Sequence, residues 1–173
     1  MSALQELESL GLRVGWRTAL VGWDGPAANG RQVEGHQIVE LAVTKLSRSP
    51  GLQGAALELA SLEGHEAEDI DRLLRRLARE NHSSEDLELR KWRLLLLRRL
   101  LDELPEDPLY AWTTLAEFWH SFGRPRDCPE IIRSFDKLPP AERYTAKARH
   151  KLVADHRAWL ATERSAVSAG EAA

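Results

Sequence analysis

The 173-residue sequence has a single cysteine, Cys128, which excludes an intramolecular disulfide and a metal site built from several cysteines. We interpret its thiol as a small apolar group of the core. A catalytic role would need a neighbouring base that lowers the thiol pKa, and the nearest histidine in the sequence is His120. That pairing stays open but is disfavoured.

Long apolar runs and blocks of one charge are also missing. The longest pure leucine run is Leu94 to Leu97, and the first residues carry Glu6 and Glu8 without a basic start. We therefore expect no signal peptide, no membrane span and a cytoplasmic location. Acids and bases are mixed along the chain and give a net charge of −3, which argues against binding to nucleic acid or anionic lipid.

The motifs of several enzyme classes are absent as well. The sequence has no H-E-x-x-H zinc motif, no phosphate-binding loop and no G-x-S-x-G elbow. Glu117 and His120 form one E-x-x-H pair, whereas di-iron sites in helical bundles need two such pairs and two further carboxylates. We therefore expect no metal, no cofactor and no catalytic residues.

What the sequence does contain is typical of a helical protein. With 43% apolar and 29% charged residues, the chain can bury the core of one globular domain. We predict an all-α fold, a single-domain irregular bundle of about seven to eight helices over residues 1–164. The remaining residues, 165–173, are predicted to form a disordered tail.

Helix signals follow one another along most of the chain. Apolar spacing, capping residues and proline or glycine breaks predict the following helices: 33–47, 52–62, one from 66, 85–104, one from 108, 129–138 and 141–163. Ser83 or Ser84 can cap the 85–104 helix. This helix is apolar around most of its circumference, so we place it at the centre of the bundle.

Arg93 is the exception on that helix, because helical rotation places it among Leu89, Leu100 and Leu104. An unpaired buried charge would cost several kcal/mol. Two solutions are open: the arginine extends along its stem to water, or a carboxylate from another helix pairs with it.

Six tryptophans are more than a typical domain of this size carries. Most should lie in the core, where replacement by alanine costs about 3–5 kcal/mol. Trp16 and Trp23 lie in a loop-rich segment with several glycines, so among the six they are the best candidates for exposed anchors of a partner, although the sequence leaves open whether they lie inside or outside.

The second half carries a recognisable pattern in the segments KWRLLLLRRLLDELPEDP, FWHSFGRPRDCPEII and FDKLPP. Its positions are Lys91 with Trp92, Asp107 with Pro108, Phe122 with Pro125, and Phe135 with Pro139. This pattern resembles an uncharacterised bacterial family, domain of unknown function 2247. The N-terminal GLRVGWRTALVGW is similar in character. The resemblance implies a shared fold and brings no catalytic residues with it.

Our leading hypothesis is a non-catalytic protein-binding module, possibly an immunity-type protein that binds and neutralises a toxin. Besides Trp16 and Trp23, we expect polar contacts from charged residues in two proline-bounded turns, namely Arg124, Arg126, Asp127, Asp136 and Lys137. The alternative is an enzyme or small-ligand binder with a cleft between helices near Glu117, His120 and Cys128. A third interpretation, nucleic-acid binding, would use the arginine-rich face of the helix from residue 66, namely Arg72, Arg75, Arg76 and Arg79.

Overall fold

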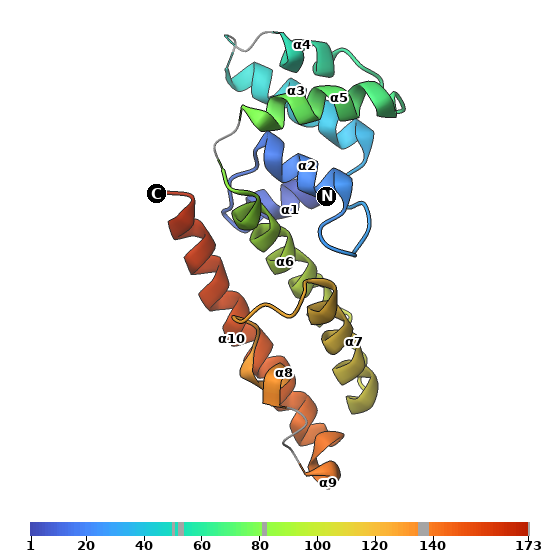
Figure 1. Ribbon diagram of the computed structural model, residues 1–173, viewed down its shortest axis with the longest axis vertical. Coiled ribbons are helices and arrows are strands. Elements are labelled where there is room, and N and C mark those ends of the chain that lie inside the picture. The colour runs from blue at the N-terminus through green and yellow to red at the C-terminus, as the bar shows by residue number, and fades with distance from the viewer. Residues whose placement is uncertain (50, 52–53, 81–82, 135–138, 173) are drawn as a thin grey trace. The chain divides into compact units, whose positions relative to one another are not determined.

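The structure is a computed structural model that describes residues 1–173 apart from 50, 52–53, 81–82, 135–138 and 173. In this described part the regular structure consists of ten helices and no strands (Figure 1). The predicted all-α bundle is therefore confirmed, with ten helices in place of seven to eight. The chain forms two compact units, Met1–Trp92 with Gly170–Ala173, and Arg93–Ala169. The expectation of a single domain over residues 1–164 stays a prediction.

The described residues of the first unit form five complete helices and the start of a sixth. Their bounds are α1 Ala3–Ser9, α2 Trp16–Asp24, α3 Gly35–Arg48, α4 Ala55–Ala60, α5 Ala67–Arg79 and α6 Glu85–Asp102. Helix α4 contacts both α3 and α5, and α2 contacts α5, as Figure 1 shows. The apolar stripe of α5 is buried as its spacing predicts, with Ile70, Leu73 and Leu74 fully covered.

Trp92 belongs to the core of the first unit. Its ring is fully buried, and its indole N–H donates a 2.9 Å hydrogen bond to the carbonyl oxygen of Thr18 in α2. The buried indole therefore has its polar atom satisfied, as a core tryptophan requires. Ser84, not Ser83, caps α6, because its hydroxyl accepts a 3.2 Å bond from the Leu87 N–H.

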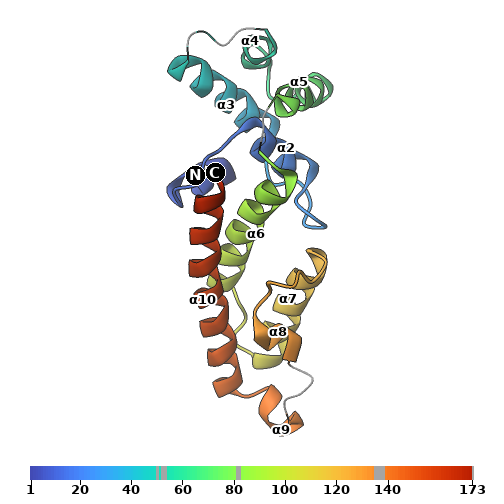
Figure 2. The ribbon, with the colours of Figure 1, turned by 60° about the vertical axis from the view of Figure 1, so that its left-hand side comes forward.

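The second unit consists of the rest of α6 and four further helices, shown in Figure 2. These are α7 Pro108–Ser121, α8 Glu130–Ser134, α9 Pro140–Arg143 and α10 Ala146–Gly170. Their core joins apolar residues of α6, α7, α8 and α10 with Leu104, which follows α6, and with the buried Cys128. Its members are Leu97, Leu101, Leu104, Ala111, Leu115, Phe118, Trp119, Cys128, Ile131 and Leu152. Of the predicted helix over 129–138, Glu130–Ser134 form α8, and 135–138 lie outside the described residues.

The last predicted helix, 141–163, is divided in the structure. Tyr144 and Thr145 separate α9 from α10, and the Thr145 hydroxyl accepts a 3.1 Å bond from the Ala148 N–H as an N-cap would. The expectation of a disordered tail is wrong for 165–172, since α10 continues to Gly170 and Val167 is fully buried. Glu171 beyond it is fixed by an ion pair with Lys91.

Among the described residues, no helix has both the length and the apolar character that crossing a lipid bilayer requires.

Candidate functional site

The second unit exposes three large apolar side chains, Leu109, Tyr110 and Tyr144, which we call the Tyr110 patch. Their exposed fractions are 45%, 65% and 47%. The first two lie in the first turn of α7, and Tyr144 follows α9 directly. Pro108 and Arg143 line the same small cavity, so these two segments lie side by side.

The first turn of α7 is fixed by its cap. The Asp107 carboxylate accepts bonds from the backbone N–H groups of Leu109 at 2.9 Å and Tyr110 at 3.1 Å. Pro108 takes the first helical position, where its fixed φ suits the helix and its missing N–H is not needed. The sequence E-D-P thus presents Leu109 and Tyr110 on a rigid turn.

The Tyr110 patch is a surface and not a cleft. The cavity beside it measures about 10 Å³, roughly one water, whereas small-molecule sites enclose about 300–1,000 Å³. Three exposed carboxylate side chains adjoin the apolar residues in the sequence: Glu106, Asp107 and Glu142. The patch therefore combines exposed apolar side chains with carboxylates that are their neighbours in the sequence.

The turn after α7 holds three of the residues expected to contact a partner. Arg124 and Arg126 are exposed, and Arg124 adopts a left-handed conformation with φ of 48°. The side chain of Asp127, 48% exposed, forms a 2.6 Å ion pair with Arg93. Asp127 therefore has a structural role as well. The other two expected residues, Asp136 and Lys137, lie outside the described residues.

The two N-terminal tryptophans differ in exposure. Trp23 is 4% exposed, its N–H donates a 3.0 Å bond to Asp71, and the Arg31 guanidinium lies 3.6 Å from its ring centroid. Trp23 is therefore not an exposed anchor, because its ring face and its N–H are both in contact with residues of the first unit. Trp16 is half-buried, with the Lys45 ammonium 5.5 Å from its ring centroid.

The structure gives little support to the alternative site of Glu117, His120 and Cys128. Glu117 and His120 are exposed on α7, whereas Cys128 is 3% exposed. Burial raises the pKa of the Cys128 thiol, which favours the unreactive protonated form. Within the described ranges, no group of three histidine, cysteine or carboxylate side chains could hold a metal ion.

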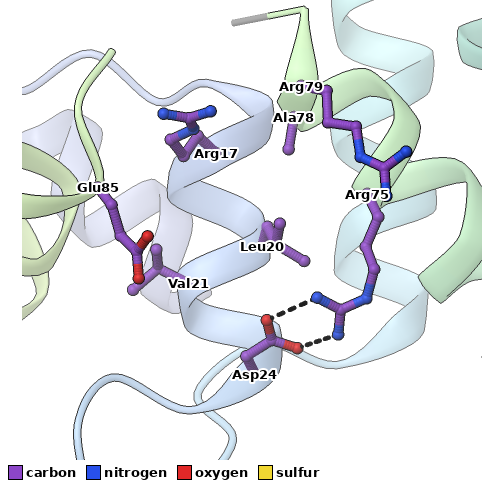
Figure 3. A pocket seen from close by; sticks show the side chains of 8 residues that line it. All are labelled: Arg17, Leu20, Val21, Asp24, Arg75, Ala78, Arg79 and Glu85. Carbon is purple, nitrogen blue, oxygen red and sulfur yellow. Dashed lines mark hydrogen bonds and ion pairs between the residues drawn. The ribbon is translucent and has the colours of Figure 1, made fainter.

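A larger hollow in the first unit, shown in Figure 3, is lined by residues of α2, α5 and the start of α6. Its volume is about 330 Å³. Arg75 points across it to Asp24 with two hydrogen bonds of 2.5 and 3.0 Å, and its Nε bonds Asp71 at 2.9 Å. The hydrogen bonds that Arg75 donates to Asp24 and Asp71 raise the pKa of its guanidinium above its usual range.

The arginine-rich face of α5 is thus partly neutralised. Besides Arg75, Arg72 pairs with Asp69 at 2.9 Å and with Glu58 at 3.0 Å. Asp71 pairs with Arg75, four residues further along α5, at 2.9 Å. These carboxylates reduce the positive charge that α5 offers to phosphate groups.

The first unit contains a buried polar cluster that the sequence patterns did not predict. Lys91 on α6 is 3% exposed and Glu88 is 1% exposed, and their side chains are joined at 2.9 Å. The Glu88 carboxylate also accepts a 2.6 Å bond from the Thr18 hydroxyl. The available signal was the Glu-x-x-Lys spacing on one helix face, which usually marks a solvated ion pair.

A family described as uncharacterised proteins conserved in bacteria, domain of unknown function 2247, matches residues 4–164. The chain belongs to this family. The match extends the resemblance, which rested on the second half of the sequence, to nearly the whole chain. No curated protein and no solved structure matches the chain.

Several positions that carried the resemblance to domain of unknown function 2247 have structural roles in this member. Trp92 packs in the core of the first unit, and Lys91 holds the buried ion cluster. Asp107 and Pro108 begin α7. Phe135 lies outside the described residues. The family pattern therefore marks packing, capping and one buried charge.

Proposed function

We propose that this member of domain of unknown function 2247 is a non-catalytic protein-binding module whose partner covers the Tyr110 patch. The observation that supports the proposal is the joint exposure of Leu109, Tyr110 and Tyr144 on two neighbouring segments. Tyrosine is enriched among the residues that dominate binding energy at interfaces. The partner would cover about 1,200–2,000 Å² in total with its complementary surface.

The charge around the patch narrows the kind of partner. Exposed Glu106 and Glu142 favour basic residues at the rim of the partner surface, which would also speed association. An immunity-type role, in which the chain neutralises a toxin by covering it, agrees with this chemistry and with the net charge of −3. Arg124 and Arg126 would then meet carboxylates of the partner.

The test is to capture a partner with the tagged full-length chain in its native host. Variants of exposed residues inside and outside the patch are then compared for their binding to that partner. We expect one stoichiometric protein to be recovered with the wild type and with Glu117→Ala, which alters an exposed residue of α7 outside the patch. Tyr110→Ala should weaken binding about 5–30-fold, equivalent to about 1–2 kcal/mol.

Two further outcomes decide the proposal. If the captured protein is a toxin, its expression alone should stop growth, co-expression of the wild-type chain should restore growth, and Tyr110→Ala should restore it less. Recovery of the bare chain, or equal capture by Tyr110→Ala and Glu117→Ala, contradicts the proposal. Arg124→Glu tests the contribution of the turn after α7. This variant should change the rate of association with the partner and the salt dependence of that rate.

A further inference from the structure

The buried cluster around Lys91 has the features of a binding site. The Lys91 ammonium has three partners: Glu88 Oε1 at 2.9 Å, the carbonyl oxygen of Arg13 at 2.9 Å, and Glu171 Oε1 at 2.8 Å. An ammonium has three N–H donors, so every donor of this buried group is used. Glu88 is buried on α6, Arg13 lies in the segment before α2, and Glu171 follows α10.

The Glu171 carboxylate is bound by donors from other segments, as the carboxylate of a separate ligand would be. Its Oε1 atom accepts from Lys91 and also from the backbone N–H of Arg13 at 2.9 Å, so two donors converge on one carboxylate oxygen. The Arg13 guanidinium donates to the backbone carbonyl of Glu171 at 2.9 Å. The Glu171 side chain is only 7% exposed. Convergent donors from a buried cation and a backbone amide are typical of anion recognition.

The donors on this side of the contact are fixed in advance. The Gly15 N–H donates to the Thr18 hydroxyl at 2.9 Å, and that hydroxyl donates to Glu88, which in turn orients Lys91. Lys45 donates to the carbonyl of Val14 at 2.9 Å, next to Arg13. The segment carrying the Arg13 amide is therefore tied down independently of Glu171.

The space around this contact is large and positive. The hollow has a volume of about 590 Å³, within the range of small-molecule sites. Arg13, Lys45 and Lys91 line it, against the carboxylates of Glu88 and Glu171. Without Glu171, three cationic side chains would face one buried carboxylate. The site would then favour another anion.

We propose that Lys91 and the Arg13 amide form a carboxylate-binding site that the chain's own Glu171 occupies and that accepts the carboxylate of a ligand when the C-terminal segment leaves. Because Glu171 is tethered, it competes as an intramolecular ligand at an effective concentration of about millimolar or above. A free carboxylate must exceed this concentration, or the C-terminal segment must be drawn away. The site belongs to the first unit and does not depend on the Tyr110 patch.

The test is rescue of the full-length Glu171→Ala chain by acetate. The substitution removes a CH₂–COO⁻ group, and acetate has the size and charge to replace it. With acetate exchanged for chloride at constant ionic strength, the Tm of Glu171→Ala should rise roughly 2–4 °C once acetate exceeds its dissociation constant several-fold. Glu171→Gln keeps the volume of the side chain, so acetate should not raise its Tm, and the wild type should change little.

A local measurement separates binding from general stabilisation. The Arg13 amide should exchange its hydrogen faster in Glu171→Ala than in the wild type, and acetate should slow this exchange again. In the wild type, acetate in large excess should shift the NMR signals of Glu171 and Ala172, whereas chloride should not. This second measurement needs no variant. Equal acetate effects on all three chains, or no acetate effect on the Arg13 amide, would overturn the proposal.

The source of the carboxylate can be tested with a peptide of residues 165–173, SAVSAGEAA, amidated at its C-terminus. If the Glu171→Ala chain binds this peptide more tightly than acetate and rejects the peptide with Gln in place of Glu, the site takes carboxylates of polypeptides. If acetate binds as well as the peptide, the site recognises the carboxylate group alone. Binding of neither one contradicts a carboxylate site.

Discussion

Arg93 lies in the core of the second unit, with 6% of its surface exposed. Its guanidinium pairs with Glu163 on α10 at 2.9 Å and with Asp127 at 2.6 Å. The guanidinium carbon also lies 5.1 Å from the ring centroid of Trp159. Of the two solutions left open for this residue, the structure therefore has the paired one. The carboxylates and the aromatic ring offset the cost of removing the charge from water.

Replacing Arg93 by methionine should destabilise the protein by about 3–5 kcal/mol, because the buried carboxylate of Glu163 would lose the guanidinium that pairs with it at 2.9 Å. Urea unfolding followed by circular dichroism would measure the loss. The double variant Arg93→Met/Glu163→Met should recover most of it, since apolar groups replace both charges. A loss below about 1 kcal/mol in the single variant would show that Glu163 is solvated in solution.

For the charged residues of the core, the sequence predicts the position on a helix face but not the partner. The position of Arg93 on an apolar face could be read from helical periodicity, but Glu163 lies 70 residues away and no spacing connects the two. Lys91 and Glu88 were missed for the opposite reason. Their short spacing looks like a solvated pair, and burial depends on contacts with Thr18 and Glu171 from distant segments.

Helix α2 approaches α6 closely at Gly22. A Cβ atom at this position would overlap the ring of the buried Trp92 and the side chain of Val33. The absence of a side chain at Gly22 therefore allows the indole of Trp92 to reach the backbone of α2 and bond the Thr18 carbonyl. A glycine in the interior of a helix is otherwise unfavourable by roughly 0.5–1 kcal/mol.

Gly22→Ala should therefore lower the free energy of unfolding by about 1–3 kcal/mol, although alanine is the better helix former. Gly51→Ala is the matched control, because nothing lies within 4 Å of a Cβ atom there. Both variants can be compared by thermal unfolding. If Gly22→Ala were as stable as the control, the packing of Trp92 against α2 would be looser than the structure shows.

The predicted helix boundaries agree with the structure where a capping residue or a proline marks them. Ser84 begins α6, and the proline in Asp107-Pro108 marks the start of α7. The break between α9 and α10 at Thr145 was missed, because threonine also fits inside a helix. The end of α10 was placed too early, since the alanine-rich tail has no strong stop signal and is held by contacts such as that of Glu171 with Lys91.

For the whole molecule, composition and periodicity sufficed to predict an all-α protein. They could not show that contacts divide the chain into two units, because this depends on which helices meet. The Tyr110 patch was also missed, since exposure of Leu109 and Tyr110 follows from how the second unit covers its own core. Of the expected partner-binding residues, Arg124 and Arg126 are exposed and Trp23 is buried.

The stability of the whole protein should depend on pH through His156, which is fully buried. Its Nε2 accepts the Trp119 indole N–H at 2.9 Å, and its Nδ1 lies 2.6 Å from the Leu152 carbonyl oxygen, to which it must donate. This arrangement requires the neutral ring, because a proton on Nε2 would oppose the indole N–H. Burial accordingly lowers the pKa of His156 below its ordinary value of 6.5.

A lowered histidine pKa means that the unfolded chain binds the proton first as the pH falls. The stabilisation is therefore complete above about pH 6.5 and is lost as the pH falls from there toward the folded pKa, by at most about 1.4 kcal/mol per pH unit. His156→Gln can keep both hydrogen bonds without titrating, so its stability should fall less between pH 7 and pH 5.

The carboxyl of Asp71 does not interfere, because its hydrogen bond with Arg75 lowers its pKa below the ordinary 3.8. Parallel unfolding curves for both chains across this range would show that His156 accepts a proton in the folded state as easily as in the unfolded one.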